Sequence, residues 1–185
     1  MASKPEIYHE KQIKQFCALH TLNNLFQTPN AFTKCSLDQL CEQLSPQLWF
    51  NPHRSMLGLG NYDVNVMIAA LQSKNYEMIW WDKRRPVFEI SMVAVFGLIL
   101  NISSPSRIGG VTLPFKSKHW IAIRSFNGTY YNLDSKLDNP LPIGNQSQLM
   151  EYLKRNLCQE DCELFIITSL SDAVPCVLAE EEDSS

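Results

Sequence analysis

The first third of the chain repeats apolar residues at the three- and four-residue spacing of amphipathic helices. Between residues 17 and 27 the pattern ends just before Pro29, a residue that stops helices. Residues 51–61 are instead rich in turn-forming residues and are expected to form an irregular connection. The pattern predicts three helices: 17–27, one that begins at the N-cap Ser36, and one from Asn61 or Asp63 to about Asn75.

The hydrophobic pattern changes in the rest of the chain to runs rich in Ile, Val, Trp, Tyr and Phe. These runs predict strands over 77–82, 93–101, 119–126, 129–133 and 163–169, with a helix over 146–157 between the last two. Helices followed by mostly neighbouring strands indicate an α+β domain, in which N-terminal helices pack on a mainly antiparallel sheet.

Length and composition indicate one folded domain. The 185 residues are 45% hydrophobic, which suffices for a sizeable core. We expect residues 1–6 to be a disordered lead, residues 7–170 to be the folded domain, and the acidic segment 171–185 to be disordered at its end. No apolar run reaches the roughly 18 residues of a membrane-spanning helix.

Charge and cysteine usage narrow the class of protein further. A net charge of −3 argues against a nucleic-acid binder, and the basic turn at residues 83–85 is better explained as a solvated loop than as a binding patch. The start of the chain lacks the apolar core of a secretory signal, which predicts a cytoplasmic protein whose six cysteines are thiols. Their spacing does not match zinc sites, so no metal or other cofactor is expected.

One predicted hairpin carries a possible catalytic pair. Asn127-Gly128 is a strong two-residue turn signal between the strands 119–126 and 129–133. In this register paired residue numbers sum to 255, which places His119 and Asp134 on one face as diagonal neighbours within hydrogen-bond reach. A slip of one residue would separate them. The carboxylate would then fix the tautomer of the imidazole, although a purely structural pair fits the hairpin equally well.

A nucleophile is suggested by Cys17 at the start of the first predicted helix. Helix N-termini favour an anion and therefore a thiolate, yet a lone helical cysteine is more often a buried core residue. The order of an early thiol, a late histidine and a carboxylate soon after it is that of papain-like cysteine hydrolases. Gln12 could complete an oxyanion hole. His20, one turn after Cys17, is a competing base, but no carboxylate in its helix is placed to orient it.

Two long motifs strengthen this interpretation. The stretches YHEKQIKQFCALHTLNNLFQ and HWIAIRSFNGTYYNLDSKL closely resemble the Josephin family of cysteine deubiquitinases, and the segment around WWDKRRP is similar to its short single-domain members. The resemblance implies a papain-like (Josephin) fold. It also implies that Cys17 is the nucleophile, His119 the general base, Asp134 the residue that orients the base, and Gln12 the oxyanion-hole glutamine.

The resemblance further implies hydrolysis of isopeptide bonds at the C-terminus of ubiquitin, including bonds within ubiquitin chains. The implied partners are ubiquitin and polyubiquitinated proteins. We expect the protein to be a monomer that does not bind nucleic acid. Residues 103–115, rich in Gly, Pro and Ser, are a candidate wall for the ubiquitin tail. Two alternatives stay open: a ubiquitin-binding module with low or autoinhibited catalysis, and a papain-like enzyme that acts on other substrates.

Overall fold

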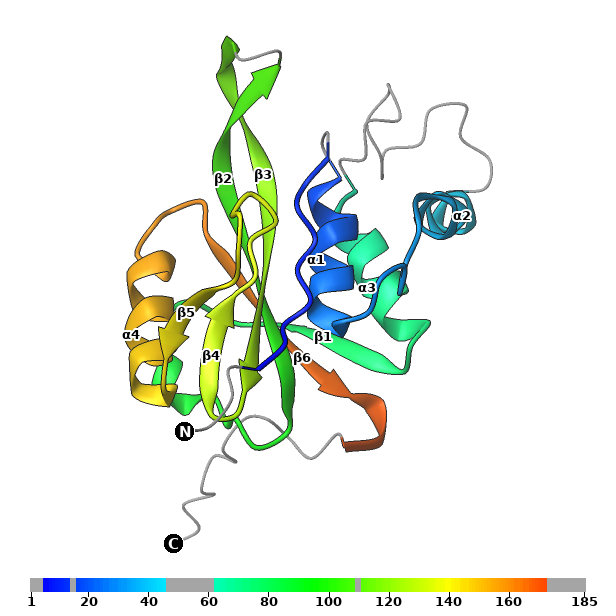
Figure 1. Cartoon of the computed structure of the whole chain (residues 1–185). Coiled ribbons are helices and arrows are strands. Elements are labelled where there is room, and N and C mark those ends of the chain that lie inside the picture. The colour runs from blue at the N-terminus through cyan, green and yellow to red at the C-terminus, as the bar shows by residue number, and fades with distance from the viewer. Residues whose placement is uncertain (1–4, 14–15, 46–61, 109–110, 173–185) are drawn as a thin grey trace, which may run out of the picture.

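The computed structural model describes residues 5–13, 16–45, 62–108 and 111–172 (Figure 1). Three helices come first in the chain, and strands make up most of the rest. The helices are α1 (Cys17–Phe26), α2 (Lys34–Leu44), α3 (Val64–Gln72) and α4 (Gln146–Leu157), with the short 3-10 helices η1 (Val87–Glu89) and η2 (Leu170–Asp172). The strands are β1 (Tyr76–Trp80), β2 (Val95–Ile108), β3 (Val111–Phe126), β4 (Thr129–Asn132), β5 (Leu141–Gly144) and β6 (Glu163–Ser169).

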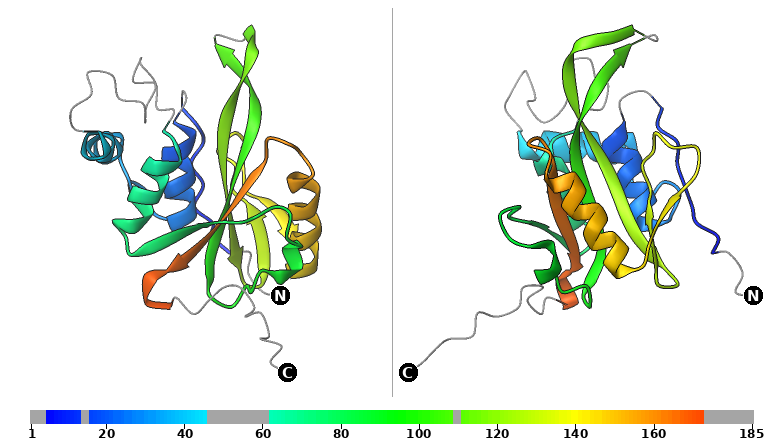
Figure 2. Two further views of the ribbon diagram at one scale, coloured as in Figure 1. Left: turned by 180° about the vertical axis from the view of Figure 1, so that it is seen from behind. Right: turned by 90° about the vertical axis from the view of Figure 1, so that its left-hand side faces the viewer.

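The six strands form one sheet in the order β1-β6-β2-β3-β4-β5, and each described pairing is antiparallel. Figures 1 and 2 show α1, α2 and α3 on one side of this sheet and α4 on the other. The predicted α+β class, with N-terminal helices packed on an antiparallel sheet, is therefore confirmed.

Alternation along the central strands creates a core on each side of the sheet. Ile99 and Ala122 point toward α1, where the fully buried Leu22 and Leu25 meet them. Strand residues of opposite parity point toward α4: Leu98, Leu100, Ile121, Ile123, Leu164 and Ile166. They pack with Leu149 and Leu153 on the apolar face of α4. A strand exposes successive side chains to opposite faces, so two-sided burial requires such continuous apolar runs.

The helix ends follow their capping residues. Asp63, one of the two predicted starts, caps α3 and accepts hydrogen bonds from the backbone N–H groups of Asn65 at 3.0 Å and Val66 at 3.2 Å. The helix ends at Gln72, three residues before the predicted end. The prediction for α2 was wrong by three residues, because Thr33 is the N-cap and Ser36 is its partner in a capping box. α4 has the predicted bounds.

Strands β2, β3 and β5 differ most from the sequence pattern. β2 and β3 extend beyond the predicted ends at 101 and 119, because their polar arms pair with each other as far as Ile108 and Val111. The register shifts between Pro105 and Arg107, as expected where proline lacks a backbone donor. The unpredicted strand β5 is short, contains Pro142 and lies at the sheet edge, where proline is tolerated.

Several sequence-based expectations concern residues outside the described ranges. They are most of the lead at 1–4, the connection at 51–61 with His53, and the acidic tail from 173 onward with Cys176. Within the residues that the structure describes, each helix is too short to cross a lipid bilayer.

Candidate active site

Cys17 is the first residue of α1, and the start of this helix leaves its positive end available to the thiol. The N-cap residue Phe16 makes no side-chain hydrogen bond, and the first turn contains no acidic residue. The backbone N–H groups of this turn and the helix dipole therefore favour a negative charge on the Cys17 sulfur. Cys17 is only 5% exposed and belongs to the core beneath α1.

His119 and Asp134 come from the predicted hairpin. Phe126 pairs with Thr129 and Ile123 pairs with Asn132, which confirms the register in which paired numbers sum to 255. The backbone N–H of Leu133 donates to the carbonyl of Ala122 at 2.8 Å and continues the ladder toward Asp134. This places the two side chains on one face, where His119 Nε2 and Asp134 Oδ1 are 2.7 Å apart.

The His119 ring links Asp134 to Cys17. Nε2 is engaged by Asp134, which leaves Nδ1 as the ring nitrogen available to Cys17, and the Cys17 side chain is close enough to raise the pKa of His119. His119 is 2% exposed, whereas the Asp134 side chain keeps 15% of its surface accessible. Imidazole and carboxylate therefore form a hydrogen-bonded pair, and the buried thiol of Cys17 lies close to its imidazole.

The pKa shifts of His119 and Asp134 favour opposite charges on these two side chains. Burial is the largest influence on the pKa of His119 and lowers it, but the hydrogen bonds to Asp134 and Cys17 and their negative charges outweigh burial and raise the pKa of the imidazole. For Asp134, burial raises the pKa, and the hydrogen bond and charge of His119, with those of Lys136, reverse the effect and lower it. A protonated imidazole beside a carboxylate is thus the favoured state of the pair.

Gln12 lies next to the loop that follows Asp134. Its backbone N–H donates to the carbonyl of Ser135 at 2.7 Å, and the Ser135 hydroxyl lies 3.4 Å from Gln12 Oε1. The structure therefore brings Gln12 to the same region as the other three candidate residues. Ser135 was not identified from the sequence, where a single serine in a polar loop carries no signal.

His20 has both ring nitrogens occupied by partners other than Cys17. Nδ1 lies 2.7 Å from Oε2 of Glu10, and the backbone N–H of Ile13 donates to Nε2 at 3.3 Å. The carboxylate that orients His20 comes from the N-terminal segment and not from the helix, so helical spacing alone missed Glu10. His20 thus serves to hold this segment against α1.

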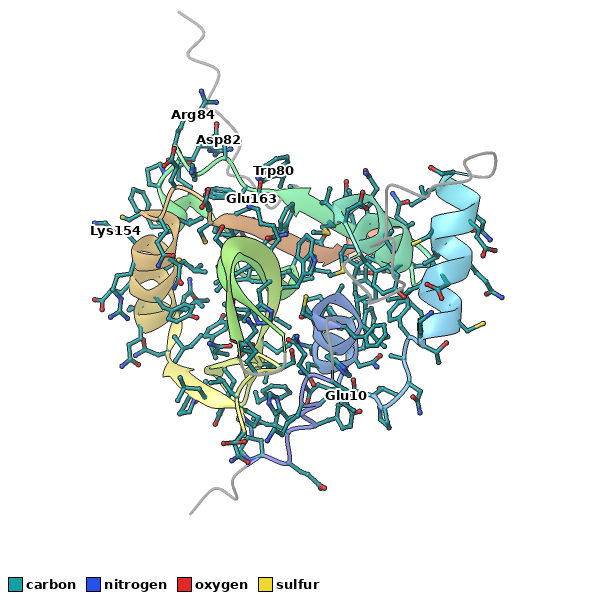
Figure 3. The ribbon with its side chains drawn as sticks, turned by 90° about the horizontal axis from the view of Figure 1, so that it is seen from above. Glu10, Trp80, Asp82, Arg84, Lys154 and Glu163 are labelled. Atoms are coloured by element: carbon teal, nitrogen blue, oxygen red, sulfur yellow. The ribbon has the colours of Figure 1, made fainter. Side chains whose placement is uncertain are left out.

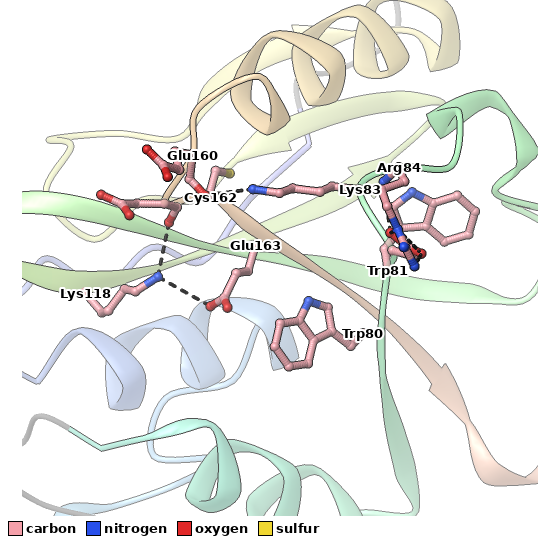
Figure 4. A pocket seen from close by; sticks show the side chains of 10 residues that line it. Trp80, Trp81, Lys83, Arg84, Lys118, Glu160, Cys162 and Glu163 are labelled. Atoms are coloured by element: carbon pink, nitrogen blue, oxygen red, sulfur yellow. Dashed lines mark hydrogen bonds and ion pairs between the residues drawn. The ribbon is translucent and has the colours of Figure 1, made fainter.

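The basic turn makes ion pairs of its own and borders a cavity. Lys83 donates to the carbonyl of Glu160 at 2.7 Å, Arg84 pairs with Asp82 and Arg85 pairs with Glu89, which supports the prediction of a solvated loop. A cavity of about 620 Å³ lies beside this turn (Figure 4). It is lined by Trp80, Trp81, Asp82, Lys83, Arg84, Lys118, Glu160, Asp161, Cys162 and Glu163.

Comparison with known proteins adds an independent line of evidence. The sequence model of the Josephin family matches residues 12–168. A Josephin-like protein of Drosophila melanogaster is 49% identical over 87% of this chain and 73% of its own length. Human Josephin-2 is 44% identical over 90% of this chain and 88% of its own length.

More distant similarity extends to human Ataxin-3-like protein, which is 28% identical over 87% of this chain and 46% of its own length. Among solved structures, the catalytic domain of Trichinella spiralis UCH37 bound to ubiquitin vinyl methyl ester aligns with 88% of this chain and 64% of that chain, at 15% identity and a TM-score of 0.38. The match to the Josephin model covers most of the chain and contains Gln12, Cys17, His119 and Asp134. The chain belongs to the Josephin family of cysteine deubiquitinases.

Proposed function

We propose that this protein is a thiol-dependent deubiquitinase that hydrolyses isopeptide bonds at the ubiquitin C-terminus, including those of ubiquitin chains. The observation that carries the proposal is the His119–Asp134 hydrogen bond of 2.7 Å, together with the Cys17 thiol close to the same imidazole at the start of α1. In this arrangement Cys17 is the nucleophile, His119 the general base and Asp134 the residue that orients the base. Because a catalytic thiol must stay reduced, the expected cytoplasmic location is part of the proposal.

The first half of the reaction acylates the enzyme. The thiol proton of Cys17 resides on His119 Nδ1, and the thiolate attacks the carbonyl carbon of the terminal glycine. The resulting oxyanion accepts hydrogen bonds from the Cys17 backbone N–H and the Gln12 side-chain amide. Collapse of the tetrahedral intermediate breaks the carbon–nitrogen bond, and His119 gives its proton to the departing lysine amine.

The second half releases ubiquitin. Water attacks the thioester while His119 Nδ1 takes one of its protons, and the carbon–sulfur bond then breaks. The products are the C-terminal carboxylic acid, which releases the second proton of the water to solvent, and the Cys17 thiolate, with the first proton held on His119 as at the start. Throughout, Asp134 accepts the hydrogen bond of Nε2 and stabilises the imidazolium.

The arms of β2 and β3 beyond the catalytic histidine are the proposed wall for the ubiquitin tail. Ile102 is the backbone partner of His119, and Lys136 Nζ lies 2.6 Å from Ser104 Oγ. The segment that begins at residue 103 thus starts beside the loop that carries Asp134. Figure 1 shows the arms of β2 and β3 projecting from one end of the sheet, beyond the start of α1. This position suits a segment that contacts an extended peptide.

The proposal is tested with ubiquitin that carries a C-terminal electrophile. The wild-type chain should form a covalent adduct that Cys17→Ala abolishes. Cys35→Ala is the matched control, because Cys35 is an exposed free thiol at the start of α2. An adduct that survives Cys17→Ala, or no adduct with the wild-type chain, would overturn the assignment.

The burial of Cys17 and His119 favours a second candidate, a ubiquitin-binding protein whose catalysis is low or autoinhibited. This candidate predicts a measurable affinity for ubiquitin together with slow or absent adduct formation. Comparing turnover of ubiquitin chains with turnover of small amides tests the remaining alternative, a papain-like enzyme for other substrates.

A further inference from the structure

The segment that carries Gln12 has no regular secondary structure and runs beside α1 (Figure 1). Its backbone is held by side chains of α1 and of the C-cap residue of that helix. The side-chain amide of Gln27 accepts from the N–H of Tyr8 at 2.9 Å and donates to its carbonyl at 3.0 Å. The amide of Asn24 does the same for Glu10, at 2.6 and 3.2 Å. An amide side chain of α1 and that of its C-cap residue thus replace the neighbouring strand that would otherwise satisfy this backbone.

The Glu10 carboxylate sits at the centre of a further set of hydrogen bonds. Besides the 2.7 Å contact with His20 Nδ1, both carboxylate oxygens lie 3.1 Å from Asn23 Nδ2, and the Tyr8 hydroxyl donates to Oε1. Only 20% of the Glu10 side chain and 11% of the His20 side chain are exposed. Figure 3 shows Glu10 beside α1, on the side of the molecule away from Trp80, Asp82 and Arg84.

This network decides which nitrogen of His20 carries the proton. A carboxylate at Nδ1 requires an N–H there, so Nε2 keeps its lone pair and can accept the backbone N–H of Ile13. Without Glu10, the imidazole loses the acceptor that holds its proton on Nδ1, and the tautomer that directs an N–H of the ring at the N–H of Ile13 becomes accessible. Glu10 therefore supports the hydrogen bond that fixes the chain directly after Gln12.

Gln12 is consequently held on both sides and through its own backbone. Glu10 and its bonds to Asn24 fix the chain before it, Ile13 is fixed after it by His20, and the Gln12 N–H is bonded to Ser135. Because α1 also begins with Cys17, the same helix that carries the nucleophile sets the position of the glutamine. Small errors in the placement of an oxyanion donor are costly, since such donors act only at short range.

We propose that Glu10 and His20 are positioning residues that act through Gln12 to complete the oxyanion hole. The inference rests on the proposed function. Neither residue touches the substrate. Glu10 sets the tautomer of His20, and His20 holds the segment that carries Gln12. The side-chain amide of Gln12 is thereby kept where the tetrahedral intermediate on Cys17 requires it.

The test is a double-mutant cycle measured on ubiquitin with a fluorogenic C-terminal amide. Glu10→Ala should lower kcat by about tenfold or more and leave KM within about twofold of the wild-type value. The loss of kcat should not exceed the roughly 100-fold to 1,000-fold loss that removal of one oxyanion donor causes. In a Gln12→Ala background the same change should have almost no further effect on kcat, because residues that act as a unit are not additive.

Two control variants separate positioning from a general loss of stability. Lys11→Ala removes an exposed ion pair with Asp138 in the same segment. Asn145→Ala removes the N-cap of α4 on the far side of the sheet. Both should keep kcat near the wild-type value. The inference would be overturned if Glu10→Ala kept the wild-type kcat. It would also be overturned if Glu10→Ala lowered kcat by the same factor in the wild-type protein and in Gln12→Ala.

His20→Phe repeats the cycle if Glu10→Ala does not fold, because phenylalanine keeps the ring and removes both nitrogens. The same criterion then applies to its effect with and without Gln12. Failure of the proposed function would show itself differently: the wild-type chain would neither turn over the fluorogenic substrate nor form an adduct with the electrophilic ubiquitin.

Discussion

Oδ1 of Asp134 lies 2.7 Å from Nε2 of His119, and this oxygen also accepts the backbone N–H of Lys136 at 2.9 Å. Two donors therefore converge on one atom, which must be an acceptor. The second donor makes the pair robust to a change of the carboxylate into an amide, because only the carbonyl oxygen of an amide can occupy that position.

Asp134→Asn should therefore retain substantial activity. The Lys136 N–H selects the amide orientation that presents oxygen to His119, and so preserves the tautomer with Nδ1 facing Cys17. We expect kcat/KM within about tenfold of wild type for Asp134→Asn and a loss of about 100-fold or more for Asp134→Ala, measured on ubiquitin with a C-terminal fluorophore. Inactivity of Asp134→Asn equal to that of Cys17→Ala would mean that the carboxylate charge itself is required.

His119→Ala should abolish turnover. Removing the imidazole leaves the thiol without a base and the leaving amine without an acid, a loss of about 10²–10⁴-fold for each proton-transfer role. His9→Ala is a suitable comparison, since the Nε2 of His9 only contacts the carbonyl of Leu137, at 3.0 Å. Initial rates on ubiquitin chains measure both. Turnover by His119→Ala close to wild type would refute the assignment of the base.

The same pair should stabilise the fold over a limited pH range. The lowered pKa of Asp134 contributes stability that is present above the unfolded value, about 4, and is lost as the pH falls through the folded value. The raised pKa of His119 contributes stability that is complete below about 6.5 and is lost as the pH rises through the folded value.

Urea unfolding of the wild-type chain and Asp134→Ala at several pH values measures this contribution. The difference in their free energies of unfolding should be largest near pH 5, within the window of about 4 to 6.5 set by the unfolded pKa values, and smaller near pH 8. A difference that is the same at both pH values would show that the ion pair does not contribute in this way.

Gly97 should not tolerate a side chain. A Cβ at this position of β2 would lie 2.6 Å from Leu25 Cδ1, 2.8 Å from Arg124 Cδ and 3.1 Å from the backbone oxygen of Ile123. Gly97→Ala should therefore lower the free energy of unfolding by about 1–3 kcal/mol, as overpacked cores do. Urea denaturation measures this loss.

Gly128→Asn is the matched glycine control for that measurement. Gly128 has a φ of +78° but no atom within 4 Å of a Cβ, and asparagine tolerates this conformation. It should change stability little. A Gly97→Ala protein as stable as wild type would show that α1 can move away from β2 without loss.

The sequence by itself determined the elements that depend on local interactions. The bounds of α4 and β6 were predicted correctly, because apolar spacing and capping residues decide them. The hairpin register was also predictable, since Asn127 and Gly128 both adopt the positive φ that their turn requires. This register alone brought His119 and Asp134 to one face of the sheet.

Only the tertiary structure decided the contacts between segments far apart in the chain. Gln12 meets Ser135 across 123 residues, and Glu10 meets His20 from a segment without periodicity. The distal arms of β2 and β3 pair although their composition is not that of strands. In each case packing around α1 and the sheet brings the two partners together. A buried polar group forms its hydrogen bond with a group that this packing places nearby, and the local sequence does not specify which group that is.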